Sequence, residues 1–243
     1  MTGTLYIVST PIGNLEDITF RAIRIFKEVA LIAAEDTRHT KNLLNHFDIH
    51  TPLTSYHDFN KEEKTVLLIA RLKENDSIAL VSDAGTPTIS DPGYYLIKKA
   101  IEEKIVVCPL PGPTALIAAL SVSGLPTDRF IFEGFLPRKK GARFNRLDNL
   151  KEDARTIIFY ESPYRIVSLL EEIASLWGEE RSVSVGRELT KVFEETIRGN
   201  VAEVLIYLKS KKVKGEIVLV VEGVRPLRGV RPQREARARK RVT

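Results

Sequence analysis

Cysteine and long apolar runs are what this sequence of 243 residues has least of. Cys108 is the single cysteine, which excludes an intrachain disulfide framework and a zinc site built on cysteines. The longest apolar runs, 29–34 and 115–120, contain six residues each, whereas a membrane-spanning helix needs about 20. The first residues also lack the regions typical of a signal peptide. We therefore expect a soluble, cytoplasmic protein that has no membrane contact.

Several common nucleotide-binding and catalytic motifs are also missing. The chain has neither the glycine-rich phosphate loop that ends in Gly-Lys-Ser or Gly-Lys-Thr nor a G-x-G-x-x-G segment, which leaves ATP and NAD without support. It has no G-x-S-x-G elbow for a nucleophilic serine. The four histidines (His39, His46, His50 and His57) do not have the ligand number and spacing of a metal site, so no metal is expected.

Positive charge is concentrated at one end of the chain. Residues 224–243 hold eight of the 37 basic residues and one of the 32 acidic ones, so this tail carries +7 while the remaining body carries −2. A segment with so many arginines and so few apolar residues is predicted to be disordered. The net charge of +5 is therefore weak support for a nucleic-acid-binding surface on the body itself.

Short apolar runs alternate with amphipathic segments from Thr4 to Val221, a pattern typical of an α/β fold with a mainly parallel sheet. Pro109–Pro113 contains three prolines and predicts a stiff connector. We expect two α/β domains, 1–110 and 111–223, followed by the basic tail at 224–243. Residues 114–123, apolar nearly all round, predict a buried helix, and residues 137–143 predict a basic loop.

Three unusual loops follow predicted strands, at residues 9–16, 83–93 and 109–114. In parallel sheets ligands bind at the carboxyl ends of the strands. The loop 83–93 contains two glycines, two prolines and two aspartates and has two interpretations. It is a rigid turn in which Asp91 caps the next helix, or it is a ligand loop in which Asp83 meets ribose hydroxyls or a cation.

Three further segments pair a carboxylate with a cation directly after a predicted strand. They are Glu35–Arg38, Tyr160–Arg165 and Arg187–Lys191. One such cluster is typical of a solvated ion pair of little energetic consequence. Three clusters at the same side of a sheet favour a polar cleft instead.

Seven segments of the chain together resemble one known family. They are Tyr6–Leu15 (YIVSTPIGNL), Ala34–Arg38 (AEDTR), Ser82–Gly93 (SDAGTPTISDPG), Pro109–Thr114 (PLPGPT), Phe135–Arg138 (FLPR), Tyr160–Arg165 (YESPYR) and Gly186–Lys191 (GRELTK). In this order they are similar to the family of ribosomal RNA small subunit methyltransferase I, a branch of the tetrapyrrole-methylase superfamily. The resemblance covers residues 3–223.

The resemblance implies a fold, an activity and partners. The fold is a non-Rossmann methyltransferase of two α/β domains with the cofactor, S-adenosylmethionine, in the cleft between them. The activity is methylation of the ribose 2′-hydroxyl of a cytidine in the decoding region of 16S ribosomal RNA, within the assembled small subunit. Members act as homodimers without a metal. The alternatives are methylation of a tetrapyrrole, as in other superfamily members, and a non-catalytic role as a ribosome-binding factor.

The resemblance and the residue chemistry together nominate site residues. In-line methyl transfer needs positioning and gains from a base or a cation near the hydroxyl. For these catalytic roles we nominate Lys191, Glu188, Glu35 and Arg38. For cofactor binding we nominate Pro11, Asp83, Ala84, Gly85, Thr86, Pro113, Thr114, Ala115, Tyr160 and Leu189. For RNA contact we nominate Arg138, Lys139, Lys140, Arg143, Arg165 and Arg187, because arginine and lysine bind phosphates.

The charge of the tail leads to a first testable prediction. Deleting residues 226–243 is expected to weaken binding to the small ribosomal subunit mainly at low salt, because nonspecific phosphate contacts are screened as salt rises. Filter binding across a salt series measures this, and cofactor affinity should stay unchanged. Equal subunit affinity with and without the tail at every salt concentration would refute the prediction.

Overall fold

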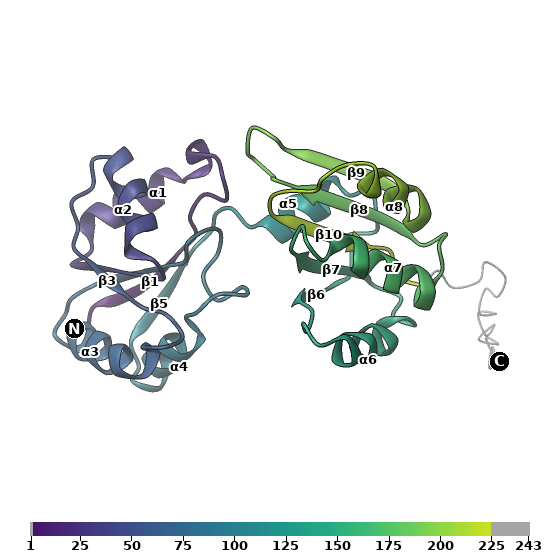
Figure 1. The fold of residues 1–243 in the computed structure, drawn as a ribbon. Coiled ribbons are helices and arrows are strands. Elements are labelled where there is room, and N and C mark those ends of the chain that lie inside the picture. The colour runs from purple at the N-terminus through teal and green to yellow at the C-terminus, as the bar shows by residue number, and fades with distance from the viewer. Residues whose placement is uncertain (1, 225–243) are drawn as a thin grey trace, which may run out of the picture.

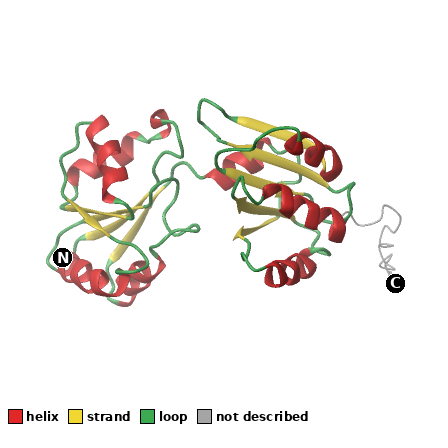
Figure 2. Cartoon of the chain, viewed as in Figure 1, coloured by secondary structure: helices red, strands yellow, loops and turns green. Residues whose placement is uncertain are grey.

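A computed structural model of the chain describes residues 2–224 as two halves, each built on its own β-sheet (Figures 1 and 2). Met1 and residues 225–243 lie outside the described residues. The predicted basic tail, 224–243, is therefore outside the description apart from Val224. Within residues 2–224, no helix combines the length and the apolar character that crossing a membrane requires.

The sheet of the first half has five strands, all parallel, in the order β3-β2-β4-β1-β5. The strands are β1 (Thr4–Val8), β2 (Leu31–Ala34), β3 (Leu53–Ser55), β4 (Ile78–Val81) and β5 (Val106–Leu110). Every residue of β2 and β4 is buried, because helices cover both faces of the sheet. This burial explains why both strands read as short apolar runs in the sequence.

Four α-helices cover the two faces of this sheet. They are α1 (Phe20–Glu28), α2 (Thr37–His46), α3 (Lys61–Lys73) and α4 (Tyr94–Glu102), and a short 3-10 helix, η1 (Leu15–Asp17), precedes α1. The apolar sides of α1 and α2 pack on one face around Phe26 and Leu44, and those of α3 and α4 pack on the other around Leu72 and Leu96 (Figure 1).

The second half contains a mixed sheet in the order β6-β7-β10-β8-β9. Its strands are β6 (Phe130–Phe135), β7 (Thr156–Glu161), β8 (Ser182–Arg187), β9 (Glu195–Asn200) and β10 (Ile217–Val221). Only β6 and β7 pair in parallel, and the other three pairs are antiparallel. The expected parallel sheet is therefore correct for the first half and wrong for the second. A loop without a helix joins β8 to β9, and such a connection returns the chain antiparallel.

Four helices belong to the second half: α5 (Ala115–Val122), α6 (Lys140–Leu150), α7 (Ile166–Trp177) and α8 (Val201–Lys209). The last three cover one face of the sheet in a large apolar core, and α5 packs on the other face. The prediction that α5 is buried holds only for one side, since Ile117 is 46% and Val122 44% exposed. The predicted basic loop 137–143 is also wrong in part, because α6 begins at Lys140.

The connection between the sheets runs through the proline-rich segment. The strand β5 ends at Leu110, and the next element, α5, packs against strands of the second sheet (Figure 1). The domain boundary predicted between residues 110 and 111 falls in this connection.

Core packing in the second half leads to a prediction about stability. Phe159 is fully buried in β7 and lies beside the Trp177 ring, with ring centroids 6.4 Å apart. Replacing Phe159 with Ala is expected to lower the free energy of unfolding by about 3–5 kcal/mol, because the lost apolar contacts leave a cavity. Urea denaturation measures the change. The control Val66→Ala, at a side chain 70% exposed, should change it by less than about 0.5 kcal/mol.

Candidate functional site

A cavity of about 440 Å³ lies between the two sheets. The first half contributes residues that follow the carboxyl ends of β1, β2, β4 and β5, and the second half contributes residues around the ends of β7, β8 and β10. Strand-end loops are the usual position of a ligand in an open parallel sheet. The volume is within the range of about 300–1,000 Å³ typical of small-molecule sites.

Hydrogen bonds join the three unusual loops to one another beneath this cavity. Thr10 and Gly85 form a two-way backbone bridge, with N···O distances of 2.9 and 3.0 Å. The Ser9 hydroxyl lies 2.9 Å from that of Thr86, which in turn donates to the carbonyl of Pro113 at 3.2 Å. Gly85 has a φ of +83°, a conformation that favours glycine. The floor of the cavity is therefore a rigid unit built from all three loops.

The loop after β1 also holds the two halves together. Ile12 is 9% exposed and belongs to the same apolar core as Leu189 and Val218 of the second half. A Cβ added to Gly13 would lie 2.4 Å from Cγ of Lys191, so only glycine permits this close approach. The cavity exists because this loop packs against the second sheet.

One wall of the cavity is acidic, with Glu35, Asp83 and Asp91. Oδ1 of Asp83 accepts the backbone N–H of Asp36 at 3.0 Å. Burial, with the nearby charges of Glu35 and Asp83, raises the pKa of Asp91 to about 6. Burial and the charge of Asp83 also raise the pKa of Glu35. Carboxyl groups with raised pKa values in a cleft are candidates for proton transfer or cation binding.

Asp91 does not cap a helix, so that interpretation of the sequence is wrong. The helix α4 begins at Tyr94 with Gly93 as its N-cap residue, at a φ of 142°, and the Asp91 carboxyl instead bonds Ser82. The sequence did not nominate Asp91 as a site residue. Its position in the loop that follows β4 was the available signal, but the helix-capping pattern gave an equally good explanation.

The opposite wall is aromatic and apolar. Tyr160 lies with Phe132 and Phe135 in edge-on contacts, at ring-centroid distances of 4.8 and 5.7 Å. Its hydroxyl accepts the backbone N–H of Leu116 at 3.2 Å, which ties β7 to the start of α5. Leu189 completes this wall. An acidic side facing an apolar side suits a ligand that carries both a flat ring and a charged end.

Most of the nominated cofactor residues meet in this cavity. Its lining includes Asp83, Ala84, Gly85, Thr86, Thr114, Ala115, Tyr160 and Leu189, together with the nominated catalytic residue Glu35. Pro11 and Pro113 are outside the lining, although the Pro113 carbonyl bonds Thr86. The structure adds residues that the sequence did not nominate, among them Ile12, Asp91 and Phe135.

Glu188 and Lys191, nominated as catalytic, form a polar group at the edge of the cavity with Glu216. The Glu188 carboxylate accepts the Glu216 N–H at 2.9 Å and the Lys191 ammonium at 3.1 Å. The backbone bond from Glu216, more than Lys191, lowers the pKa of Glu188, which makes it a poor base. Although burial opposes it, bonding to Glu216 and Glu188 raises the pKa of Lys191, so its amine is a cation near neutral pH.

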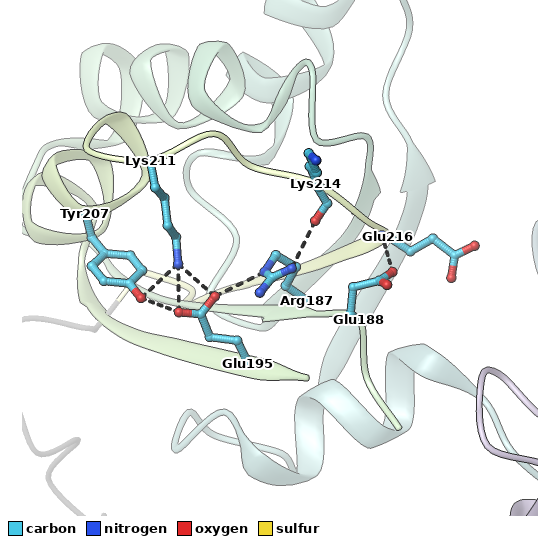
Figure 3. A network of polar contacts seen from close by, with 7 residues as sticks. All are labelled: Arg187, Glu188, Glu195, Tyr207, Lys211, Lys214 and Glu216. Atoms are coloured by element: carbon cyan, nitrogen blue, oxygen red, sulfur yellow. Dashed lines mark hydrogen bonds and ion pairs between the residues drawn. The ribbon is translucent and has the colours of Figure 1, made fainter. Parts of the chain in front are cut away.

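Arg187 belongs to a second polar network at the end of β8 (Figure 3). Its guanidinium bonds Glu195 at 3.1 Å and the carbonyl of Lys214 at 3.2 Å. Glu195 also accepts hydrogen bonds from Tyr207 and, at 2.8 Å, from Lys211. Although burial opposes it, these bonds lower the pKa of Glu195 to about 2. Arg187 is thus occupied in holding β8, β9 and α8 together, which argues against the nominated phosphate contact.

The other nominated cations differ in burial and in pairing. Arg143 is buried and makes two bonds to Glu172, at 2.5 and 2.7 Å, and Arg165 bonds Glu161 at 2.7 Å. Both side chains are thus paired with carboxylates of the fold, and their nominated phosphate contacts stay predictions. Arg138, Lys139 and Lys140 are exposed and follow Phe135, a residue of the cavity wall. Arg38 is 90% exposed and paired with Asp36 at 2.6 Å, outside this cavity.

Comparison with known proteins places the chain in a family. The profile described as "Tetrapyrrole (Corrin/Porphyrin) Methylases" matches residues 4–205. Proteins named "Ribosomal RNA small subunit methyltransferase I" are similar over most of the chain. The one from Halalkalibacterium halodurans is 55% identical over 221 residues, 91% of this chain and 76% of the relative. The one from Escherichia coli O157:H7 is 52% identical over 223 residues, 91% and 78% of the two chains. The chain belongs to the tetrapyrrole methylase family.

Solved structures show the same tetrapyrrole methylase fold at low sequence identity. Uroporphyrin-III C-methyltransferase from Thermus thermophilus, complexed with S-adenosyl homocysteine, aligns with a TM-score of 0.63 at 18% identity, over 90% of this chain and 97% of that one. Diphthine synthase aligns with a TM-score of 0.68 at 14% identity, over 91% and 90% of the two chains. The expected fold of two α/β sheets is confirmed.

The raised pKa of Asp91 predicts how the stability of this methylase depends on pH. The pKa rises from an ordinary value of 3.8 to about 6, so the folded state binds more protons between these values, and ionised Asp91 destabilises the fold above pH 6. Asp91→Asn is expected to raise the free energy of unfolding at pH 7 by about 1 kcal/mol, less than the shift alone implies because solvent screens a partly exposed group.

Urea denaturation of both proteins at pH 7 and at pH 3.5 measures this effect. The difference should largely disappear at pH 3.5, where Asp91 is protonated in the folded chain and mostly protonated in the unfolded one. A variant that is less stable at pH 7 would contradict the electrostatic interpretation.

Proposed function

We propose that the protein transfers a methyl group from S-adenosylmethionine to the ribose 2′-hydroxyl of a cytidine in the decoding region of 16S ribosomal RNA. The small ribosomal subunit is the proposed substrate. The observation that carries the proposal is the match, over nine-tenths of the chain, to relatives named for methylation of small-subunit ribosomal RNA. A cytoplasmic location and a homodimer, predicted from the sequence, belong to the same proposal.

The cavity has the chemistry that S-adenosylmethionine needs. Its apolar wall, with Ile12, Leu189 and Val218, suits a flat base, and the acidic wall suits ribose hydroxyls and an ammonium group. Burial raises the pKa of Glu35 and of Asp91, so their ionised forms are disfavoured in the fold and are stabilised by a cationic group bound beside them. When bound, the cofactor supplies an electrophilic methyl group on a sulfonium.

Two carboxyls of this wall are the best candidates for the proton transfer. A ribose hydroxyl becomes a better nucleophile as a base takes its proton, and a base is most effective when its pKa lies near the working pH. Asp91 and Glu35 have pKa values raised toward that range, whereas Glu188 has a lowered one. We assign the base to the Glu35–Asp91 pair and a positioning role to Lys191.

Arg138, Lys139 and Lys140 are the proposed phosphate contacts. All three are exposed, and within residues 2–224 they make no ion pair, unlike Arg143, Arg165 and Arg187. They follow the cavity residue Phe135 along the chain, which supports a phosphate contact close to the cavity. A cationic surface there attracts the RNA backbone without selecting its sequence.

A labelling experiment tests the function. The protein is incubated with labelled S-adenosylmethionine and small subunits from a strain that lacks the enzyme, and the modified nucleotide is mapped. We expect label on one ribose 2′-oxygen of a cytidine in the decoding region. Label only on a base, or no label at all, would reject the proposal. Label on a tetrapyrrole without subunits would favour the alternative of a corrin-precursor methylase, and absence of cofactor binding would favour a non-catalytic factor.

Lys191 provides a prediction about rate. Its side chain packs over Gly13 and bonds Glu188 and Glu216, so it fixes the edge of the cavity. Lys191→Ala is expected to lower the single-turnover rate at saturating cofactor by roughly ten- to a hundredfold, because small displacements of reacting groups are costly. The pH dependence between 6 and 8 should stay unchanged, since the ammonium does not titrate there.

Lys212→Ala is the matched control, at an exposed lysine of the same half, and should retain the full rate. An unchanged rate for Lys191→Ala would show that this residue does not position the site. A loss of the pH profile would instead identify Lys191 as the base.

A further inference from the structure

A second, open groove of about 750 Å³ lies beside the central cavity, on the first half of the molecule. The polar and basic side chains that line it come from α2, from β3 and from the chain between them: Arg38, Lys41, Asn45, His50, Thr54 and Ser55. None of the proposed steps of methyl transfer uses this groove. Its lining of amines, an amide and hydroxyls suits an anionic, hydrogen-bonding ligand.

The groove has cations without carboxylate partners. Asp36 pairs with Arg38 and Asp48 pairs with His50, at 2.6 and 3.0 Å. Within the described residues no carboxylate pairs with Lys41 or with Lys64, and the Lys64 ammonium donates to the Thr54 hydroxyl at 3.3 Å. Lys41, in the groove lining, and Lys64, which reaches the groove residue Thr54 from α3, can therefore bind an external anion.

A fully exposed aromatic ring lies in the turn that follows the groove residue Ser55 along the chain. Phe59 is 99% exposed and lies in the turn between β3 and α3. Asn60 holds this turn, since its Oδ1 accepts the His57 N–H at 2.9 Å and its Nδ2 donates to the Ser55 hydroxyl at 3.2 Å. The His57 ring lies edge-on, 6.1 Å from that of Phe59. An exposed ring on a turn held in this way offers a face on which a base can stack.

Sheet register places this turn next to the central cavity. In the pairing of β2 with β3, Ala34 lies opposite Ser55, and the Tyr56 N–H donates to the Ala34 carbonyl at 2.8 Å. The next residue along β2 is Glu35, which lines the central cavity. The groove, the Phe59 turn and the acidic wall thus follow one another along the same edge of the first sheet.

We propose that this groove holds the single-stranded RNA that flanks the target nucleotide, with phosphates on Lys41 and Lys64 and a neighbouring base stacked on Phe59. A positively charged groove with an exposed aromatic ring is the general means of binding single-stranded nucleic acid, and unstacked RNA bases are recognised on aromatic side chains. The inference rests on the proposed function and extends it. It assigns RNA contacts to the first half, opposite the proposed cations of residues 138–140.

Filter binding to small subunits across a salt series tests the groove without requiring methyl transfer. The double variant Lys41→Gln, Lys64→Gln is expected to bind about tenfold more weakly near physiological salt, with a salt slope shallower by about 1.4 units, because two fewer phosphate contacts release fewer counterions. Phe59→Ala is expected to weaken binding at least fivefold, with an unchanged salt slope, and Phe59→Trp to restore it, because stacking needs a ring and not a charge.

Matched controls lie at the opposite end of the first sheet, in and just after α4. Lys104→Gln removes an exposed lysine charge there, and Ile101→Ala removes a side chain that is 61% exposed. Both should bind subunits normally. Every variant should bind S-adenosylmethionine with unchanged affinity and unfold at the same urea concentration, which separates a lost RNA contact from a damaged cavity or fold.

Two outcomes would overturn the inference. One is unchanged subunit affinity and salt slope in the lysine and Phe59 variants. The other is a loss of affinity for subunits with no loss for protein-free 16S ribosomal RNA, which would assign the groove to a ribosomal protein. The labelling experiment reports separately on the function, because a protein that binds through this groove and transfers no methyl group would refute only the proposed reaction.

Discussion

The contact of the loop after β1 with the second sheet is the constraint on which the site depends. Ile12 lies in an apolar core with residues of β7, β10 and α5, and Gly13 lies directly under the aliphatic chain of Lys191. The same loop is joined by backbone bonds to Gly85. Apolar burial therefore fixes the loops of one sheet against the wall formed by the other, and the cavity between them follows from this packing.

The cavity is polarised because its two walls come from different elements. The acidic wall follows strands of the first sheet, where burial disfavours the ionised forms of Asp91 and Glu35 and raises their pKa values. The aromatic wall comes from β6 and β7, where Tyr160 lies between two phenylalanines. Buried carboxylates destabilise a fold, and a fold that keeps them in one wall of a cavity typically uses them to bind a ligand or to catalyse a reaction.

The sequence predicted the local elements of the first half well, because its strands are buried on both faces and read as short apolar runs. It missed the antiparallel pairing of β8, β9 and β10, since strand direction depends on connections and not on the residues of a strand. It also missed the helical start at Lys140, where a run of basic residues resembles a loop. The ion pair of Arg143 with Glu172 joins residues 29 positions apart, so no local pattern could distinguish Arg143 from its exposed neighbours.

The sequence by itself determined the family, the alternation of strands and helices, and the loops that hold the site, because these depend on residue order and local spacing. Only the tertiary structure decided which of the nominated arginines are paired with a carboxylate. Arg143, Arg165 and Arg187 have the same chemistry as Arg138, yet the first three are bound to carboxylates of the fold. It also moved Asp91 from a helix cap to the cavity wall and paired Ser55 with Ala34, the residue before Glu35, because burial and strand pairing depend on neighbours that the chain supplies from distant positions.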